Sequence, residues 1–100
     1  MPSFENSFSS LANERKLTEP ELIRAVRFMI AAEYEAIQLY MQLAESTDNI
    51  LAQAVLKDIA DEERVHAGEF LRLLNELDPD EQIFYDQGTE EVEEMIEEME

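Results

Sequence analysis

Two long stretches of the sequence carry apolar residues at spacings that alternate between three and four, and this pattern constrains the fold more than any other feature. The first stretch contains Leu22, Val26, Met29, Ala36, Tyr40 and Leu43. The second contains Ala52, Leu56, Ile59, Phe70, Leu73 and Leu77. Such spacing is typical of helices that face other helices, because it gathers the apolar side chains on one side of each helix.

Short polar segments mark the ends of both stretches. At the first start, Thr18 can cap the free amides and Glu21 follows three residues later, as in a capping box. Residues 46–49 are four residues that favour caps and turns, and an Asp-Pro-Asp segment at 78–80 ends the second stretch. The sequence therefore predicts an all-α fold whose central unit is an antiparallel two-helix hairpin over residues 18–78.

The segments that flank the hairpin are expected to contribute less to the fold. Residues 1–17 are polar with scattered apolar residues, and we expect a flexible N-terminal arm. Residues 79–100 are expected to form a linker and then a short acidic helix from Thr89. A chain of 100 residues suits one small domain with a modest core, so oligomerisation is a natural source of further stability.

Charge and cysteine content exclude several classes of function. The formal net charge of −18 disfavours binding to nucleic acid or anionic membranes and favours cations as partners. The chain has no cysteine, which excludes disulfides, thiolate zinc sites and iron–sulfur clusters. No apolar stretch approaches the ~20 residues of a membrane span, and the N-terminus lacks an apolar segment of signal-peptide length. A cytoplasmic location is the expectation.

Three ionisable residues interrupt the two apolar faces. Continuing the first pattern leads through Glu33, and continuing the second leads through Glu63 and His66. A charged carboxylate at such a position is costly unless it has a partner. Glu33 and Glu63 are equally far from residue 48 in the predicted turn, so an antiparallel hairpin brings them to one level. His66 lies one helical turn beyond Glu63 on the same face.

This grouping has two interpretations. The three residues form either a metal site or a purely structural feature, which is a hydrogen-bonded cluster that fixes the register of the helices or a misassigned face with Glu33 in solvent. Oxygen and nitrogen ligands without thiolate suit iron or manganese. A di-iron carboxylate bundle needs a Glu from each of two helices and a Glu-x-x-His from each of two others. This chain carries one of each, so two chains related by a two-fold axis would complete the set.

The residues around these positions resemble known motifs. The segment from Glu33 to Tyr40, a Glu followed three and seven residues later by Ala and Tyr, resembles the first-helix motif of the ferritin and rubrerythrin superfamily. The segment from Asp61 to His66 resembles the partner motif, D-E-E-x-x-H. Ordinary members carry both motifs twice. Because this chain carries them once, over about residues 19–78, it resembles the encapsulated ferritins, half-length ferroxidases packaged inside encapsulin shells.

The resemblance implies a specific assembly and activity. A dimer of hairpins would form a ferritin-like four-helix bundle that holds two iron ions between the protomers, and dimers would assemble into an annular decamer. The chain would oxidise ferrous to ferric iron for storage or detoxification inside an encapsulin nanocompartment, with the shell protein as a partner. Manganese suits the same ligands. By position, Glu33, Glu63 and His66 would be the metal ligands, with Glu63 bridging. Tyr40 would be either a residue that hydrogen-bonds near the site or a core aromatic residue with its hydroxyl satisfied.

Two departures from the family pattern stand out. Glu35 matches one position of an outer acidic site that conducts metal inward, but the other position falls on Ala32. Glu35 and Glu62 are therefore either accessory metal-binding residues or solvated surface. Residues 90–100 are unlike the apolar and basic docking peptide of free encapsulated ferritins. Either that tail has been removed, or the domain is naturally fused to its shell protein.

Other functions fit part of the pattern. A rubrerythrin-like di-iron peroxidase uses similar ligands, but the lack of cysteine removes the second iron centre that supplies its electrons. A manganese catalase-like activity fits the ligands but not the half-length pattern. A non-catalytic acidic helical adaptor that recruits a basic partner fits the charge alone.

Overall fold

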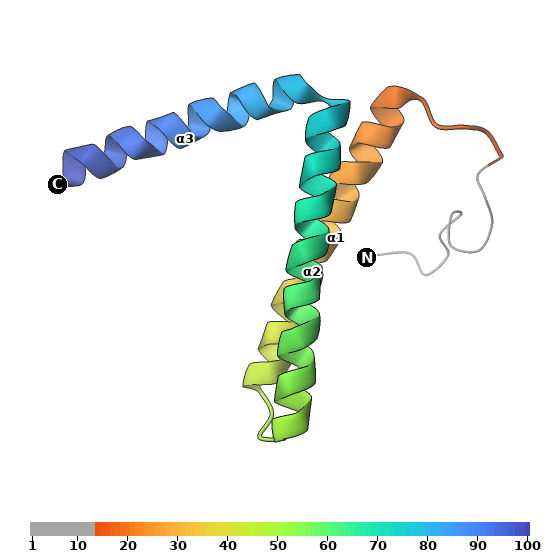
Figure 1. The fold of residues 1–100 in the computed structure, drawn as a ribbon, viewed down its shortest axis with the longest axis vertical. Coiled ribbons are helices and arrows are strands. Elements are labelled where there is room, and N and C mark those ends of the chain that lie inside the picture. The colour runs from red at the N-terminus through yellow and green to blue at the C-terminus, as the bar shows by residue number, and fades with distance from the viewer. Residues whose placement is uncertain (1–13) are drawn as a thin grey trace.

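The computed structural model, which describes residues 14–100, consists of three helices in series (Figure 1). Helices α1 (Glu19–Glu45) and α2 (Ile50–Leu77) run antiparallel and side by side, and α3 (Pro79–Met99) projects away from the end of α2. No strand occurs in this part of the chain. This arrangement confirms the predicted all-α hairpin with an additional C-terminal helix. None of the three helices has the length and apolar character that crossing a membrane requires.

The caps of the hairpin follow the polar segments of the sequence. At the start of α1 the backbone amide of Glu21 donates to the Thr18 hydroxyl at 3.3 Å, and the Thr18 amide donates to the Glu21 carboxylate at 2.8 Å, which completes a capping box. Hydrogen bonds from Arg15 and Thr18 hold the pKa of the Glu21 carboxyl well below its usual range. Asn49 caps α2 by accepting from the Ala52 amide at 2.9 Å.

The core of the hairpin is thin. The buried side chains among residues 14–100 are Val26, Ile30, Ala44, Ala60, Ala67 and Leu74. Val26, Ile30 and Leu74 form one cluster near the open end, where Phe70 of α2 packs against them. Three of the six are alanines, so the two helices approach closely but bury little apolar surface. A core of this size gives limited stability to an isolated chain.

The apolar face of each helix is wider than the expected single line of residues. Ile30 and Ala44 of α1 are buried against α2, whereas Met29 and Leu43, which the sequence pattern also placed in the core, are 45% and 46% exposed. Leu73 of α2 is likewise 42% exposed. Each helix therefore has an inner apolar half that closes the hairpin and an outer half that is uncovered in a single chain.

The C-terminal segment differs from the expected linker and short helix. α3 begins at Pro79 and continues through Gly88 to Met99, so no linker separates it from α2 except Asp78. Proline is tolerated at the first helical position, and Asp80 and Glu81 favour the start of a helix electrostatically. One glycine costs a helix only about 1 kcal/mol, which the helix-forming residues around it offset. Of the expected N-terminal arm, residues 1–13 lie outside the described residues.

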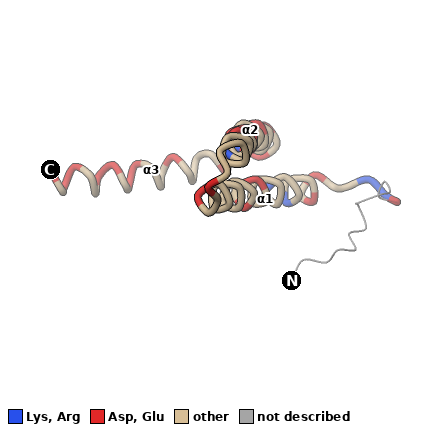
Figure 2. The backbone as a smooth tube through the Cα atoms, turned by 90° about the horizontal axis from the view of Figure 1, so that it is seen from below, with Lys and Arg blue, Asp and Glu red and all other residues tan. Residues whose placement is uncertain are grey.

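α3 is acidic along its whole length. Asp and Glu recur from Asp80 to Glu98, whereas all seven Lys and Arg residues of the chain precede it (Figure 2). No α3 side chain is buried, and among residues 14–100 its backbone approaches that of α2 but not that of α1. The helix therefore extends from the hairpin as an arm.

Candidate metal centre

The structure brings Glu33, Glu63 and His66 together midway along the hairpin. Glu33 comes from α1, and Glu63 and His66 come from successive turns of α2. One ligand atom from each residue lies within 4.8 Å of the other two. The Nδ1 atom of His66 is 3.8 Å from Glu33 Oε2 and 3.6 Å from Glu63 Oε2. The helical spacing and the antiparallel register thus bring the three side chains to one level, as the sequence pattern predicts.

The two carboxylates are largely shielded from solvent. The side chains of Glu33 and Glu63 are only 18% and 19% exposed, whereas that of His66 is 50% exposed. The Oε2 atom of Glu33 is buried and has no hydrogen-bond partner among the described residues. A buried carboxylate oxygen without a donor is costly, so this position requires a cation, a proton or a donor from elsewhere.

The separations do not favour a hydrogen-bonded acid–histidine cluster. Both His66 Nδ1 distances, 3.6 Å to Glu63 and 3.8 Å to Glu33, exceed the usual range of an N–H···O hydrogen bond. Two carboxylates and one imidazole are oxygen and nitrogen donors of the kind that ferrous iron and manganese accept. The donor set and the unpartnered Glu33 oxygen therefore fit a metal ion.

The remaining sequence-predicted residues lie outside this cluster. Glu35 and Glu62 are exposed and do not belong to the group of converging ligand atoms. Asp61 is 74% exposed, and its carboxylate forms an ion pair with Arg64 at 2.6 Å on the surface of α2. Tyr40 is half-buried two helical turns after Glu33, and its hydroxyl forms no hydrogen bond to another described residue. The role of Tyr40 stays a prediction.

The cluster opens onto the uncovered apolar half of the hairpin. His66 belongs to this outer half, together with Met29, Leu43 and Leu73, which are exposed on either side of its level. The imidazole is consequently the ligand that is most accessible from outside the chain. One chain offers three side chains that could ligate a metal and an open apolar face next to them.

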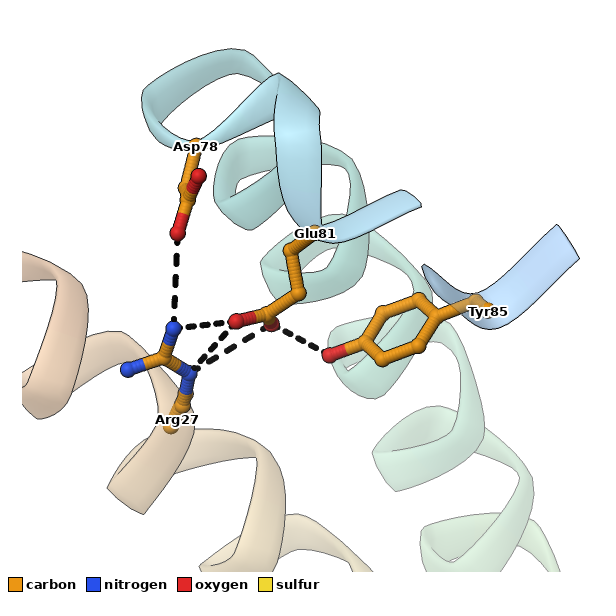
Figure 3. Close-up of polar contacts among 4 residues, drawn as sticks. All are labelled: Arg27, Asp78, Glu81 and Tyr85. Carbon is orange, nitrogen blue, oxygen red and sulfur yellow. Dashed lines mark hydrogen bonds and ion pairs between the residues drawn. The ribbon is translucent and has the colours of Figure 1, made fainter. Parts of the chain in front are cut away.

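Sequence reasoning missed a second polar cluster, at the elbow between the hairpin and α3. Arg27 of α1 contacts Asp78 and Glu81, and Tyr85 donates a hydrogen bond to Glu81 (Figure 3). Arg27 and Glu81 are 54 residues apart. Because each has the pattern of an ordinary surface residue, the sequence contains no signal for their pairing.

Three comparisons place the chain among known proteins. A family model described as Rubrerythrin matches residues 25–100. "Encapsulin nanocompartment cargo protein EncC" of Myxococcus xanthus is 47% identical over 75 residues, which is 75% of this chain and 57% of that protein. The "Ferritin-like-encapsulin shell fusion protein" of Pyrococcus furiosus is 39% identical over 82 residues, which is 82% of this chain and 24% of that protein. This chain thus spans a little over half the length of the first relative and about a quarter of the second.

A solved structure shows the same fold. The crystal structure of the encapsulated ferritin domain from Pyrococcus furiosus is similar to the chain with a TM-score of 0.83 and 35% sequence identity. The similarity covers 92% of this chain and 94% of that one, so it includes the hairpin and α3.

Proposed function

The chain belongs to the rubrerythrin family, and on this premise we propose that two copies of it form a ferroxidase, which oxidises ferrous to ferric iron at a shared di-iron site. One observation supports this function more than any other. A buried oxygen of Glu33 has no partner among the described residues, and it lies beside the carboxylate of Glu63 and the imidazole of His66. A bound cation would satisfy all three groups.

The number of ligands supports a site shared by two copies. A di-iron carboxylate bundle needs two single glutamates and two Glu-x-x-His pairs, which is twice what one chain offers. The exposed Met29, Leu43 and Leu73 lie along the same outer half of the hairpin as His66. A second copy on this face, related by a two-fold axis, would cover these side chains and bring a second set of ligands to the first. The result would be a ferritin-like four-helix bundle.

In this reaction ferrous iron is the substrate, and the residues of the chain hold it. Two copies of Glu33 and Glu63 supply four negative charges, which balance two ferrous ions while both His66 side chains remain neutral. The iron itself supplies the redox chemistry, because each ferrous ion gives up one electron to oxygen or peroxide. As the family resemblance implies, Glu63 would be the carboxylate that bridges the two ions.

The relatives suggest where this reaction takes place. One is named as the cargo of an encapsulin nanocompartment and the other as a fusion to an encapsulin shell. We therefore propose that the chain acts inside such a compartment in the cytoplasm, in contact with the shell protein. As the family resemblance implies, its dimers would form an annular decamer. Ferric iron would pass to the surrounding compartment, because a hairpin of this size has no room for a mineral.

Anaerobic titration with ferrous iron, followed by addition of oxygen and optical detection of ferric-oxo species, tests this function. We expect rapid oxidation by the wild-type protein and by a Glu69→Ala control, in which an exposed carboxylate of α2 is removed. A Glu33→Ala, His66→Ala double variant should lose the reaction. If the double variant oxidises iron at the wild-type rate, the proposed site is wrong. Turnover with peroxide but not with oxygen would favour a peroxidase, and the absence of ferrous binding would favour an adaptor.

A further inference from the structure

The direction of α3 is not determined by apolar packing within the chain. No α3 side chain is buried, and the apolar stripe of its second half is exposed. The stripe consists of Val92, Met95, Ile96 and Met99. The bend between α2 and α3 occurs at the single residue Asp78, whose φ and ψ of −141° and 75° lie outside the helical region. Rotation about this residue would swing the whole arm.

Arg27 provides a connection that opposes such rotation. Its Nε atom lies 3.0 Å from Glu81 Oε1 and 3.3 Å from Glu81 Oε2, and its Nη2 atom contacts the same carboxylate (Figure 3). Nη2 also lies 3.5 Å from Asp78 Oδ2. A guanidinium that meets a carboxylate through two nitrogens fixes the relative orientation of both groups, which a single point contact does not. The contact therefore constrains the angle of α3 and not only its distance from α1.

The surroundings of Glu81 strengthen this contact. Its side chain is only 15% exposed, although it belongs to a helix with no buried residue. Hydrogen bonds from Arg27 and Tyr85 lower the pKa of the Glu81 carboxyl, and the hydrogen bond to Glu81 raises the pKa of the Tyr85 hydroxyl. Glu81 is therefore charged at neutral pH. It accepts hydrogen bonds from both sides, from α1 and from the next turn of α3.

The apolar packing below this network is incomplete. A small pocket remains at the elbow, lined on the α2 side by Leu71, Leu74 and Asn75 and on the α3 side by Gln82 and Tyr85 among others. Close packing of the two helices therefore does not hold the angle by itself. Among residues 14–100, Arg27 forms the only ion pairs between the hairpin helices and the segment from Asp78 onward.

We propose that the contact of Arg27 with Glu81, supported by Asp78 and Tyr85, is a latch that fixes the direction of α3 relative to the hairpin. The latch joins the first and last helices and forms only when the hairpin has brought Arg27 to the elbow. It determines where the acidic arm and its apolar stripe are presented. The latch is independent of the metal ligands, since it lies at the open end of the hairpin.

Distance measurements between spin labels test the latch directly. The chain has no cysteine, so Asp58→Cys on α2 and Glu93→Cys on α3, both at exposed positions, introduce a unique pair of labels. Labelled chains are mixed with an excess of unlabelled ones before assembly, so that distances within one chain are read. In the wild-type background we expect a single narrow distance distribution. Arg27→Gln should replace it with a broad or shifted one.

Arg24→Gln is the matched control. It removes the same charge one turn earlier on α1, from an arginine that is exposed and forms no ion pair with the described residues. It should leave the distribution narrow. Glu81→Gln weakens the contact from the other side and should broaden the distribution as Arg27→Gln does, while circular dichroism checks that the helices remain. The latch is refuted if both elbow variants keep the wild-type distribution, or if Arg24→Gln broadens it equally.

Discussion

Glu33 has a carboxylate oxygen between α1 and α2 where the described residues offer no hydrogen-bond donor. Without a cation, this group destabilises the folded chain, since a buried polar atom without a partner costs about 1–3 kcal/mol, and more when charged. We expect Glu33→Met, which keeps a similar length without polar atoms, to raise the free energy of unfolding of the iron-free protein by about 1 kcal/mol or more. The same variant should lose the stabilisation that ferrous iron gives to the wild type.

Urea unfolding under anaerobic conditions, with and without ferrous iron, measures both effects. Glu69→Met is the control, because the exposed Glu69 has no buried oxygen to replace. If Glu33→Met destabilises the iron-free protein, then Glu33 already has a stabilising partner in the absence of metal. The expected destabilising effect of Glu33 is common at functional sites, where folding stability is given up for function.

The residues of the candidate site could be predicted from the sequence, whereas those of the elbow could not. Glu33, Glu63 and His66 occupy positions where the helical period requires apolar residues, so their polarity is itself the signal. Arg27 and Glu81 are charged residues on helix surfaces, which is the ordinary case. Their contact depends on the torsion angles of Asp78, which no periodic pattern encodes.

At the scale of whole elements, α3 is the helix with the weakest support. It has no buried residue, and an isolated helix of 21 residues without packing is marginal in water. Gly88 lies in its interior, and a methyl group added there would meet nothing within 4 Å in a single chain. We expect Gly88→Ala to stabilise α3 by up to about 1 kcal/mol, because alanine has the higher helix propensity.

Hydrogen exchange resolved to the amides of α3 measures this change. Protection should increase around residue 88 and remain the same in α1. A decrease in protection after Gly88→Ala would mean that another molecule approaches the glycine closely, where the added methyl group has no room.

The ends of the hairpin helices were predictable because Thr18 and Asn49 are capping residues with a chemical signature.

The rotation of each helix about its own axis was only partly predictable. One line of apolar residues was expected to face the core, but burial shifts by one position, so that Ile30 is covered and Met29 is not. Because the apolar face is wide, the helix can bury either position, and packing against the partner helix determines which one is covered. α3 was expected to begin only at Thr89, because proline and glycine are common at helix ends; instead the helix begins at Pro79 and Gly88 lies in its interior.

At the scale of the whole molecule, the chain is an L-shaped arrangement with much uncovered apolar surface. The hairpin and the arm extend over 47 × 44 × 24 Å, and large apolar side chains are exposed on all three helices. Contiguous exposed apolar surface marks sites of association in soluble proteins. A periodic pattern identifies these side chains as apolar but does not tell whether the same chain or another one covers them. The oligomeric state therefore stays a prediction.

Iron should strengthen the association of two copies if they share the ligands. A ligand that binds only the dimer stabilises it by RT ln(1 + [L]/Kd), which is about 2.7 kcal/mol at a hundredfold excess over Kd. For each ion bound at that excess, we expect the concentration at which dimers dissociate to fall by about a hundredfold under anaerobic ferrous iron, as measured by analytical ultracentrifugation. Glu63→Ala should abolish the shift, because it removes the proposed bridging carboxylate from both halves of the site. Glu69→Ala should preserve the shift, since it removes an equal charge from an exposed position of the same helix. Equal dissociation concentrations with and without iron would show that iron does not favour the dimer, and the shared site would then be wrong even if the protein oxidises iron.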